Sequence, residues 1–179
     1  VDKDAWYFEA VQYVYKNGLF NGISTTTFSP DVEMSRAMLA AVLYRLAGSP
    51  AGDGKAPAFT DVAPDTWYTD AVDWANGNGI VTGYGNGLFG GTDSITREQL
   101  VVMLYRYAKF MKHDTAAAGD LSAFTDAGDA SGWAVEALRW AYAEGLITGR
   151  TATTIVPQGT ATRAEVAMIL MRFGEELAK

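Results

Sequence analysis

One pattern of landmark residues occurs three times along the 179-residue chain. A tryptophan is followed by glycines at offsets +12 and +16 and by arginines at +30 and +39. The tryptophans are Trp6, Trp67 and Trp133; the glycines are Gly18, Gly79 and Gly145, then Gly22, Gly83 and Gly149; the arginines are Arg36, Arg97 and Arg163, then Arg45, Arg106 and Arg172. Such self-similarity predicts three copies of one structural unit, each too small to bury its apolar face alone.

The spacing between copies indicates where the units are joined. The tryptophans are 61 and 66 residues apart, whereas the offset from tryptophan to arginine is constant, so the five extra residues lie between Arg106 and Trp133. Residues 48–57 and 112–123 are rich in Gly, Ala, Asp and Pro, the composition of exposed connections. We therefore expect three repeats: residues 1–50, 51–115 and 116–179, the last two each beginning with a linker.

Within each repeat the pattern predicts a helix, a loop and a second helix. After each tryptophan an i, i+3, i+4 apolar stripe such as Ala71, Trp74 and Ala75 indicates an amphipathic helix, which the +12 glycine ends. Ser35, Thr96 and Thr162 stand as N-caps of the second helix, and Gln99 and Glu165 complete a capping box in the last two copies. Three equivalent second helices predict an all-α fold around a central three-helix bundle.

Composition excludes several classes of function. The net charge is −7, with 14 Lys and Arg against 21 Asp and Glu, so there is no diffuse basic field for nucleic acid or an anionic membrane. There is no Cys and only one His, so thiol nucleophiles, disulfides and thiolate metal sites are excluded. No apolar run approaches the roughly 18 residues of a membrane span. We expect no cofactor, no metal and no membrane insertion, and the start at Val1 suggests a mature or excised fragment.

Arg36, Arg97 and Arg163 are predicted at the first position inside the second helix. A cation there faces the positive end of the helix dipole, which costs about 0.3–1 kcal/mol relative to a neutral residue. An anionic partner is therefore expected. It is either an Asp of a neighbouring repeat, in a salt bridge, or the carboxylate of a ligand held jointly with the free backbone N–H groups of the helix end. Arg45, Arg106 and Arg172 lie nine residues further on, about half a turn round the helix, and are expected to point to solvent.

Other repeated residues also leave two interpretations open. Asp61 and Asp126 follow Phe-Thr just ahead of the second and third repeats, where they serve either as capping or turn residues or in sugar binding. For a tryptophan that leads an amphipathic helix a core position is the expected use, and a stacking platform for a sugar ring is the alternative. Tyr84 lies in a loop too rich in glycine to bury it well. Two carboxylates suffice for glycoside cleavage, but no pair recurs with the repeats. Repetition therefore favours multivalent binding without catalytic residues.

These motifs resemble the S-layer homology (SLH) domain family. The resemblance is carried by Phe-Thr-Asp-Val at 59–62, Gly-Ile-Val-Thr-Gly-Tyr at 79–84 and Ile-Thr-Arg-Glu at 95–98, then by Gly-Leu-Ile-Thr-Gly at 145–149 and Thr-Arg-Ala-Glu at 162–165. The first copy lacks the leading Phe-x-Asp segment. The third loop lacks the glycine–aromatic pair, and Ile155 replaces the aromatic found at Phe28 and Phe89. We therefore expect three unequal grooves, with one or two binding sites in all.

The resemblance implies a pseudo-threefold spindle with grooves between adjacent repeats. It also implies a noncatalytic module that anchors a larger bacterial surface protein to secondary cell-wall polysaccharide, often through a pyruvate ketal, in the cell wall or S-layer. By matching positions, Arg36, Arg97 and Arg163 would hold the ketal carboxylate, Asp61 and Asp126 would accept from sugar hydroxyls, and Gly83 and Tyr84 would line a groove. Trp67 and Trp133 complete the predicted carbohydrate-binding set. The alternative is a protein–protein or self-assembly module of the same fold, with the arginines in structural salt bridges.

Overall fold

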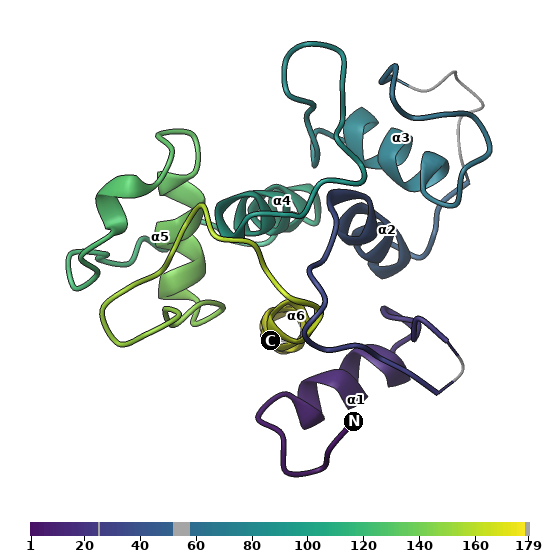
Figure 1. The fold of residues 1–179 in the computed structure, drawn as a ribbon. Coiled ribbons are helices and arrows are strands. Elements are labelled where there is room, and N and C mark those ends of the chain that lie inside the picture. The colour runs from purple at the N-terminus through teal and green to yellow at the C-terminus, as the bar shows by residue number, and fades with distance from the viewer. Residues whose placement is uncertain (25, 52–57, 178–179) are drawn as a thin grey trace.

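The computed structural model describes residues 1–24, 26–51 and 58–177, and this part of the chain contains six α-helices and one short 3₁₀ helix. The α-helices are α1 (Phe8–Lys16), α2 (Arg36–Leu46), α3 (Thr69–Gly77), α4 (Arg97–Phe110), α5 (Val135–Ala143) and α6 (Arg163–Leu177), and η1 spans Ala127–Asp129. In Figure 1, α2, α4 and α6 lie at the centre, with α1, α3 and α5 outside them. The predicted all-α class and the alternation of outer and central helices are confirmed.

The central helices begin where the capping residues predict. Ser35 Oγ accepts a hydrogen bond from the N–H group of Met38 at 3.2 Å, and Thr96 and Thr162 cap α4 and α6 in the same way. In return, the side-chain oxygens of Gln99 and Glu165 accept hydrogen bonds from the N–H groups of Thr96 and Thr162. The capping box is therefore present in the two copies where it was predicted.

The outer helices end at the predicted glycines. Gly18, Gly79 and Gly145 have φ angles of 66°, 70° and 68°, in the left-handed region that suits glycine. After α1, the N–H group of Leu19 donates to Val14 O at 2.8 Å and that of Gly18 donates to Tyr15 O at 3.0 Å, the pair of bonds that defines a Schellman motif. The same pair closes α3 and α5. Each glycine thus redirects the chain into the loop that follows.

Each outer helix packs against the central helix of another repeat. The contacts join α3 to α2, α5 to α4, and α1 to α6. The first two place an outer helix on the central helix of the preceding repeat, and the third joins the first repeat to the last. The three repeats therefore form a closed ring, which a hydrophobic pattern within one repeat does not predict.

A second ring joins the residues just before the N-caps of the central helices. The N–H group of Met34 donates to Ala161 O at 2.9 Å, that of Ala161 to Ile95 O at 3.0 Å, and that of Ile95 to Met34 O at 2.8 Å. All three residues are buried. Because each residue gives one bond and receives one, the ends of α2, α4 and α6 are tied together without leaving these buried groups unpaired.

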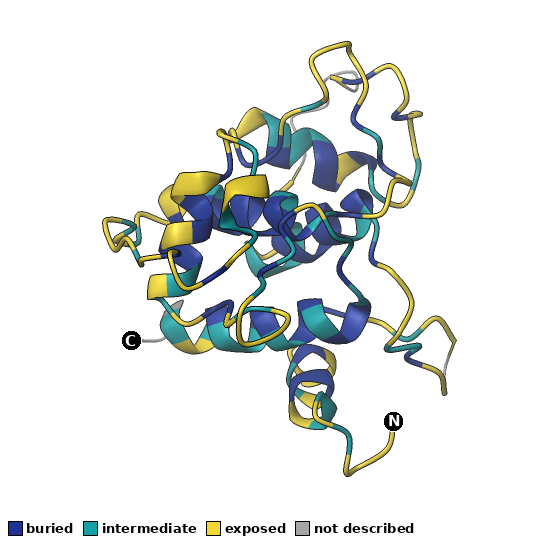
Figure 2. Ribbon diagram, turned by 60° about the vertical axis from the view of Figure 1, so that its left-hand side comes forward, coloured by how far each residue is buried: buried dark blue, intermediate teal, exposed yellow. Residues whose placement is uncertain are grey.

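The apolar core is one continuous cluster that includes residues of all six α-helices, among them Leu43, Leu104 and Leu170 of the central helices. The rings of Tyr107 and Phe173 meet across α4 and α6, with their centroids 6.0 Å apart. Figure 2 shows the buried residues on the inner helix faces and the exposed residues mainly along the loops and outer faces. This supports the predicted shared burial by the central helices.

The repeat boundaries at 50/51 and 115/116 stay predictions, and residues 52–57 of the first predicted linker lie outside the described residues. Within the described segments, no helix is long and apolar enough to cross a membrane. The same segments contain no cluster of three or more His, Cys, Asp or Glu side chains suited to a metal ion.

Candidate functional site: three grooves between repeats

Three grooves run between the repeats, and each is lined by residues of all three. In each repeat, the first arginine is the one at offset +30 and the second arginine is the one at offset +39. A groove contains the first arginine of one repeat, the loop and second arginine of the next, and the tryptophan of the remaining one. Groove A, of about 370 Å³, includes Arg36, Arg106 and Trp133; groove B, of about 290 Å³, includes Arg97, Arg172 and Trp6; groove C, of about 240 Å³, includes Arg163, Arg45 and Trp67. Each groove therefore exists only when the ring is assembled.

The first arginines are buried, with exposed fractions of 5% for Arg36, 7% for Arg97 and 6% for Arg163. The Nε–H group of each donates to a loop carbonyl of the next repeat around the ring, that of Phe89 at 2.9 Å, Ile155 at 2.7 Å and Phe28 at 2.9 Å. Burial lowers the pKa of all three guanidinium groups, although arginine remains protonated. Each cation thus fastens one repeat to the loop of another.

The backbone N–H groups at these helix ends are not free for a ligand. Those of Arg36 and Ala37 donate to Asp93 O and Gly91 O, each at 3.0 Å, and the starts of α4 and α6 are bonded in the same way to loops of the next repeat. The expectation that free N–H groups join the guanidinium in holding a carboxylate is therefore wrong. The loop carbonyls occupy them because the ring presses each loop against the end of a neighbouring central helix.

The salt-bridge interpretation is also wrong for two of the three arginines. Among residues that the structure describes, Arg36 and Arg163 form no ion pair, whereas Arg97 Nη1 lies 3.8 Å from Glu165 Oε1. Burial lowers the pKa of Arg36 and the charges of Asp93 and Asp61 raise it, but from beyond salt-bridge distance, and aromatic rings lie over the guanidinium groups. Arg36 Cζ lies 4.7 Å from the ring centroid of Tyr84, and Arg163 Cζ lies 4.6 Å from that of Phe28. A cation–π contact stabilises the charge without neutralising it.

The second arginines line the grooves, so the expectation that they point to solvent is wrong. Arg45 and Arg172 donate to the carbonyls of Leu19 and Leu146 at 2.8 Å and 3.2 Å, and Arg106 donates to Thr82 Oγ1 at 3.3 Å. In the ring, a central helix borders two grooves. Its first arginine lines the groove that contains the loop of the next repeat. Its second arginine, half a turn away, lines the groove that contains the loop of its own repeat. Their recurrence at one offset was the sequence signal for this role.

The repeated tryptophans are exposed, contrary to the expected core position. Their exposed fractions are 62% for Trp6, 64% for Trp67 and 57% for Trp133. The Trp6 and Trp67 rings lie nearly perpendicular to the rings of the tyrosines that follow them, with centroids 5.2 Å and 5.0 Å apart. Each tryptophan forms part of a groove wall. This position suits the alternative use, as a flat apolar platform for a sugar ring.

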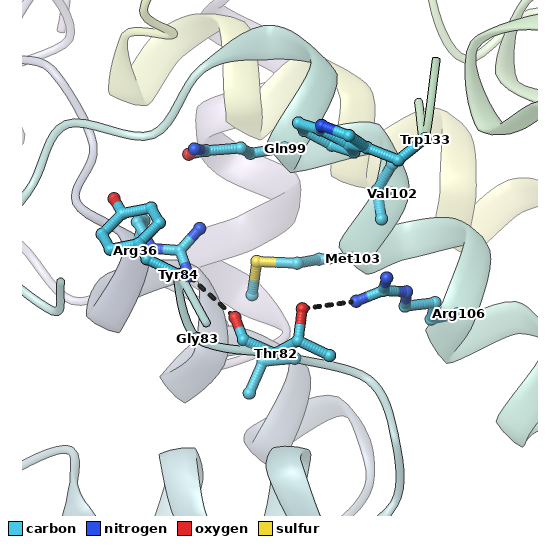
Figure 3. Close-up of a pocket in the computed structure, with 10 residues that line it drawn as sticks. Arg36, Thr82, Gly83, Tyr84, Gln99, Val102, Met103, Arg106 and Trp133 are labelled. Atoms are coloured by element: carbon cyan, nitrogen blue, oxygen red, sulfur yellow. Dashed lines mark hydrogen bonds between the residues drawn. The ribbon is translucent and has the colours of Figure 1, made fainter. Parts of the chain in front are cut away.

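Groove A brings together five residues that the sequence singled out separately: Arg36, Gly83, Tyr84, Arg106 and Trp133 (Figure 3). Arg36 Nη2 donates to Thr82 O at 3.1 Å, and Arg106 donates to the side chain of the same threonine, so Thr82 lies between the two cations. Tyr84 covers Arg36 and donates from its hydroxyl to Asp93 Oδ2 at 2.8 Å. A Cβ at Gly83 would approach Leu88 O to 2.4 Å, so the loop path requires glycine.

Asp61 and Asp126 brace the loops rather than lining grooves A to C. The two carboxylate oxygens of Asp61 accept from the N–H groups of Phe89 and Gly90, both at 2.8 Å. Asp126 does the same for Ile155 and Val156, at 2.9 Å and 2.8 Å. Desolvation raises the pKa of both carboxyl groups. These amide bonds, the N–H group of each aspartate itself and the charge of Arg36 or Arg97 together outweigh it, so both pKa values lie below their usual range. The predicted bonds from sugar hydroxyls to these carboxylates stay untested.

The grooves differ at two equivalent positions. The third residue of the central helix is Gln99 in groove A, Glu165 in groove B and Met38 in groove C. The residue after the +16 glycine is Tyr84 in A, Arg150 in B and Ile23 in C, and these residues also line the grooves. In groove B, Arg150 Nη2 lies 2.9 Å and 3.0 Å from the two carboxylate oxygens of Glu165. Sequence reasoning missed this pair because it treated Glu165 only as a cap.

Glu98 is a second residue that sequence reasoning missed. It is buried in the first turn of α4, where its carboxylate accepts from the N–H and hydroxyl groups of Ser131, both at 2.9 Å. Ser131 precedes Trp133 by two residues, so this contact fixes the segment that brings Trp133 to groove A. The corresponding positions are Ala37 and Ala164, and the repeat pattern therefore gave no signal for it.

Residues 1–38, 58–101 and 123–167 each match the family model described as the S-layer homology domain. The chain belongs to this family. The three SLH segments correspond to the three copies of the tryptophan–arginine pattern, and together they contribute every arginine and tryptophan named above except Arg45, Arg106 and Arg172.

Related SLH-containing proteins differ widely in their other parts. The chain is 30% identical to an endoglucanase of Bacillus sp. (strain KSM-635), 28% to an S-layer protein of Bacillus thuringiensis subsp. finitimus, and 27% to a cellulosome-anchoring protein of Acetivibrio thermocellus. The alignments cover 95%, 100% and 81% of this chain, but only 18%, 22% and 33% of those proteins. The SLH region is thus a module shared by S-layer proteins, an anchoring protein and an enzyme, and it indicates a place in the cell wall or S-layer.

Proposed function

We propose that this chain is a noncatalytic anchoring module that binds secondary cell-wall polysaccharide through a pyruvylated, carboxylate-bearing sugar, and so attaches a larger surface protein to the wall. SLH membership and the names of the S-layer and anchoring relatives support the anchoring role. The carboxylate-bearing sugar is inferred from the grooves. The small share of each relative that aligns supports linkage to further domains.

The observation that carries this proposal is the state of Arg36 in groove A. Its guanidinium is buried and forms no ion pair with any residue in the described segments, and the charges of Asp93 and Asp61 act on it only from beyond salt-bridge distance. Two of its five N–H groups donate to Phe89 O and Thr82 O. The other N–H groups, together with the second cation Arg106, form a positive site beside an exposed tryptophan. A carboxylate attached to a sugar ring matches both parts, because the anion meets the arginines and the ring lies against the indole.

The alternative, a protein–protein or self-assembly module with arginines in salt bridges, is favoured only by groove B. There Arg97 and Arg150 both face Glu165. Grooves A and C have two arginines each and no carboxylate among the residues that line them. The polysaccharide proposal accounts for these two cationic grooves, and the salt-bridge alternative does not.

A sedimentation assay with purified cell walls tests the proposal, using walls before and after the polysaccharide is removed. The wild type should bind only untreated walls. Arg106→Ala should weaken binding by about 1.5–3 kcal/mol, the range for a hydrogen bond to a charged group. Lys16→Ala removes the same charge from an exposed site outside the grooves and should bind like the wild type. Equal binding to stripped walls would refute the polysaccharide as the ligand.

A further inference from the structure

The three grooves share one frame and differ in the residue at the third position of the central helix. The shared frame is two arginines and one tryptophan in each groove. At the variable position groove A has the neutral amide of Gln99, groove B the carboxylate of Glu165, and groove C the thioether of Met38. Groove B differs in a second way, because it has a third arginine, Arg150, which pairs with Glu165.

In groove B the carboxylate of Glu165 pairs with arginines, as the carboxylate of a ligand would. Both of its oxygens lie within 3.0 Å of Arg150 Nη2, and its Oε1 lies 3.8 Å from Arg97 Nη1. Its Oε2 also accepts from the N–H group of Thr162 at 2.8 Å, which fixes the carboxylate in place. Desolvation raises the pKa of Glu165, but the bonds from Thr162 and Arg150 and the charges of Arg150 and Arg97 outweigh it, so the pKa lies below the usual range and the group is charged at neutral pH.

Groove A has the same frame, but it lacks both that carboxylate and the extra arginine that pairs with it in groove B. Gln99 makes the same capping bond, from the N–H group of Thr96 to its Oε1 at 3.3 Å, but brings no charge. Figure 3 shows Gln99 on the rim of the groove with Arg36, Tyr84 and Trp133. A like charge beside an incoming carboxylate costs binding free energy, and its absence leaves the arginines open to a ligand.

From this comparison we propose that Glu165 is the specificity-determining residue of groove B: its carboxylate acts as a built-in substitute for the ligand anion and closes this groove to carboxylate-bearing sugars, while Gln99 leaves groove A open to them. This inference rests on the proposed function, since it takes the same ligand class. It predicts that one isosteric exchange opens groove B and the reverse exchange closes groove A.

The chain supplies the controls for both exchanges. Gln99 shows that glutamine completes the capping box at this position, so Glu165→Gln keeps the helix start of α6. Glu165 shows the same for glutamate, so Gln99→Glu keeps the helix start of α4. Each groove also has its own reporter: Trp133 for A, Trp6 for B and Trp67 for C, whereas Trp74 and Trp140 line none of them.

The experiment is a titration followed through the indole N–H signals in NMR spectra, each assigned by a Trp→Phe variant. The probe is the pyruvate ketal of a hexose methyl glycoside. The control probe is the matching acetone ketal, in which a methyl group replaces the carboxylate. In the wild type the pyruvate ketal should shift Trp133 and leave Trp6 unmoved. In Glu165→Gln it should also shift Trp6, and in Gln99→Glu the affinity reported by Trp133 should fall by about tenfold or more. The acetone ketal should reproduce none of these effects.

The outcomes separate the two proposals. If Trp133 does not respond in the wild type, the proposed function is overturned and this inference falls with it. If Trp133 responds but Trp6 responds equally in the wild type, or stays unmoved in a folded Glu165→Gln protein, the proposed function stands and the role of Glu165 is overturned. Unshifted Trp74 and Trp140 signals report that each variant is folded.

Discussion

At the scale of single residues, the first arginines combine a structural role with the proposed binding role. Arg36 ties α2 to the loop of the second repeat through the carbonyls of Phe89 and Thr82, and it also faces groove A. A substitution here therefore affects both the stability of the free protein and the binding site. The second arginine of the groove, Arg106, is less buried and has one bond to a threonine hydroxyl.

Arg36→Ala should lower the free energy of unfolding by about 1–3 kcal/mol, because two loop carbonyls lose their donors inside the protein. Arg106→Ala should cost less than about 1 kcal/mol, because the hydroxyl that it contacts can bond to water. Urea denaturation of both variants measures the difference. Equal losses in the two variants would show that the buried bonds of Arg36 contribute nothing to stability.

Asp61 and Asp126 should make stability fall in acid. The pKa of each is lower in the folded protein than in the unfolded chain, so the unfolded state binds more protons as the pH falls. Their contribution is complete above about pH 5 and is lost progressively below about pH 4, as the pH falls through the folded pKa. Urea denaturation at a series of pH values should show this loss, and it should be smaller in Asp61→Asn. An unchanged acid dependence in that variant would contradict the loop-bracing role.

At the scale of elements, α1 packs against α6 with the side chain of Tyr13 directly over a glycine of α6. A Cβ at Gly174 would lie 1.9 Å from the hydroxyl oxygen of Tyr13, so an added methyl group would displace that side chain. This contact joins the first repeat to the last. The other central helices meet their outer partners without a glycine at the corresponding position, where Ala47 and Ala108 stand.

Gly174→Ala should therefore destabilise the protein by about 1–3 kcal/mol, the usual cost of overpacking, even though alanine is the better helix former. Gly77→Ala is the matched control, because Gly77 also lies in a helix but has nothing within 4 Å of an added Cβ. It should raise stability by about 0.4–1 kcal/mol. Thermal unfolding of the two variants should shift in opposite directions, and a shift in the same direction would refute the close contact.

At the scale of the whole molecule, the ring makes each groove a property of three repeats. Groove A requires Arg36 from the first repeat, Arg106 from the second and Trp133 from the third. The ring of bonds among Met34, Ile95 and Ala161 likewise needs one residue from each. No pair of repeats therefore contains a complete groove.

A fragment of residues 51–179 should lose wall binding and unfold at a lower temperature than the whole chain. It lacks α1, the first arginine of groove A and one member of the hydrogen-bonded ring. Adding residues 1–50 as a separate chain should restore binding, because the predicted boundary lies where the linker between the first two repeats begins. Wall binding by the fragment alone, at the affinity of the full chain, would show that the ring is not required.

The sequence by itself determined the local structure of this protein. The positions of Ser35, Thr96 and Thr162 predicted the starts of the central helices, and the +12 glycines predicted the ends of the outer ones, because caps depend on bonds within a few residues. The shared apolar stripes predicted the central bundle. The family motifs supported the same fold and indicated Arg36, Tyr84 and Trp133 as candidate binding residues, without assigning them to one groove.

The tertiary structure decided how the repeats face one another. Periodicity identifies the apolar face of a helix but not the neighbour that covers it, so neither the packing of each outer helix on another repeat nor the closure of α1 on α6 followed from the sequence. That closure gives each central helix two grooves, which turns Arg106 inward and leaves Trp133 exposed on a groove wall. It also brings Arg97 to Glu165, and so the charge of each groove is set by contacts between repeats that no pattern within one repeat records.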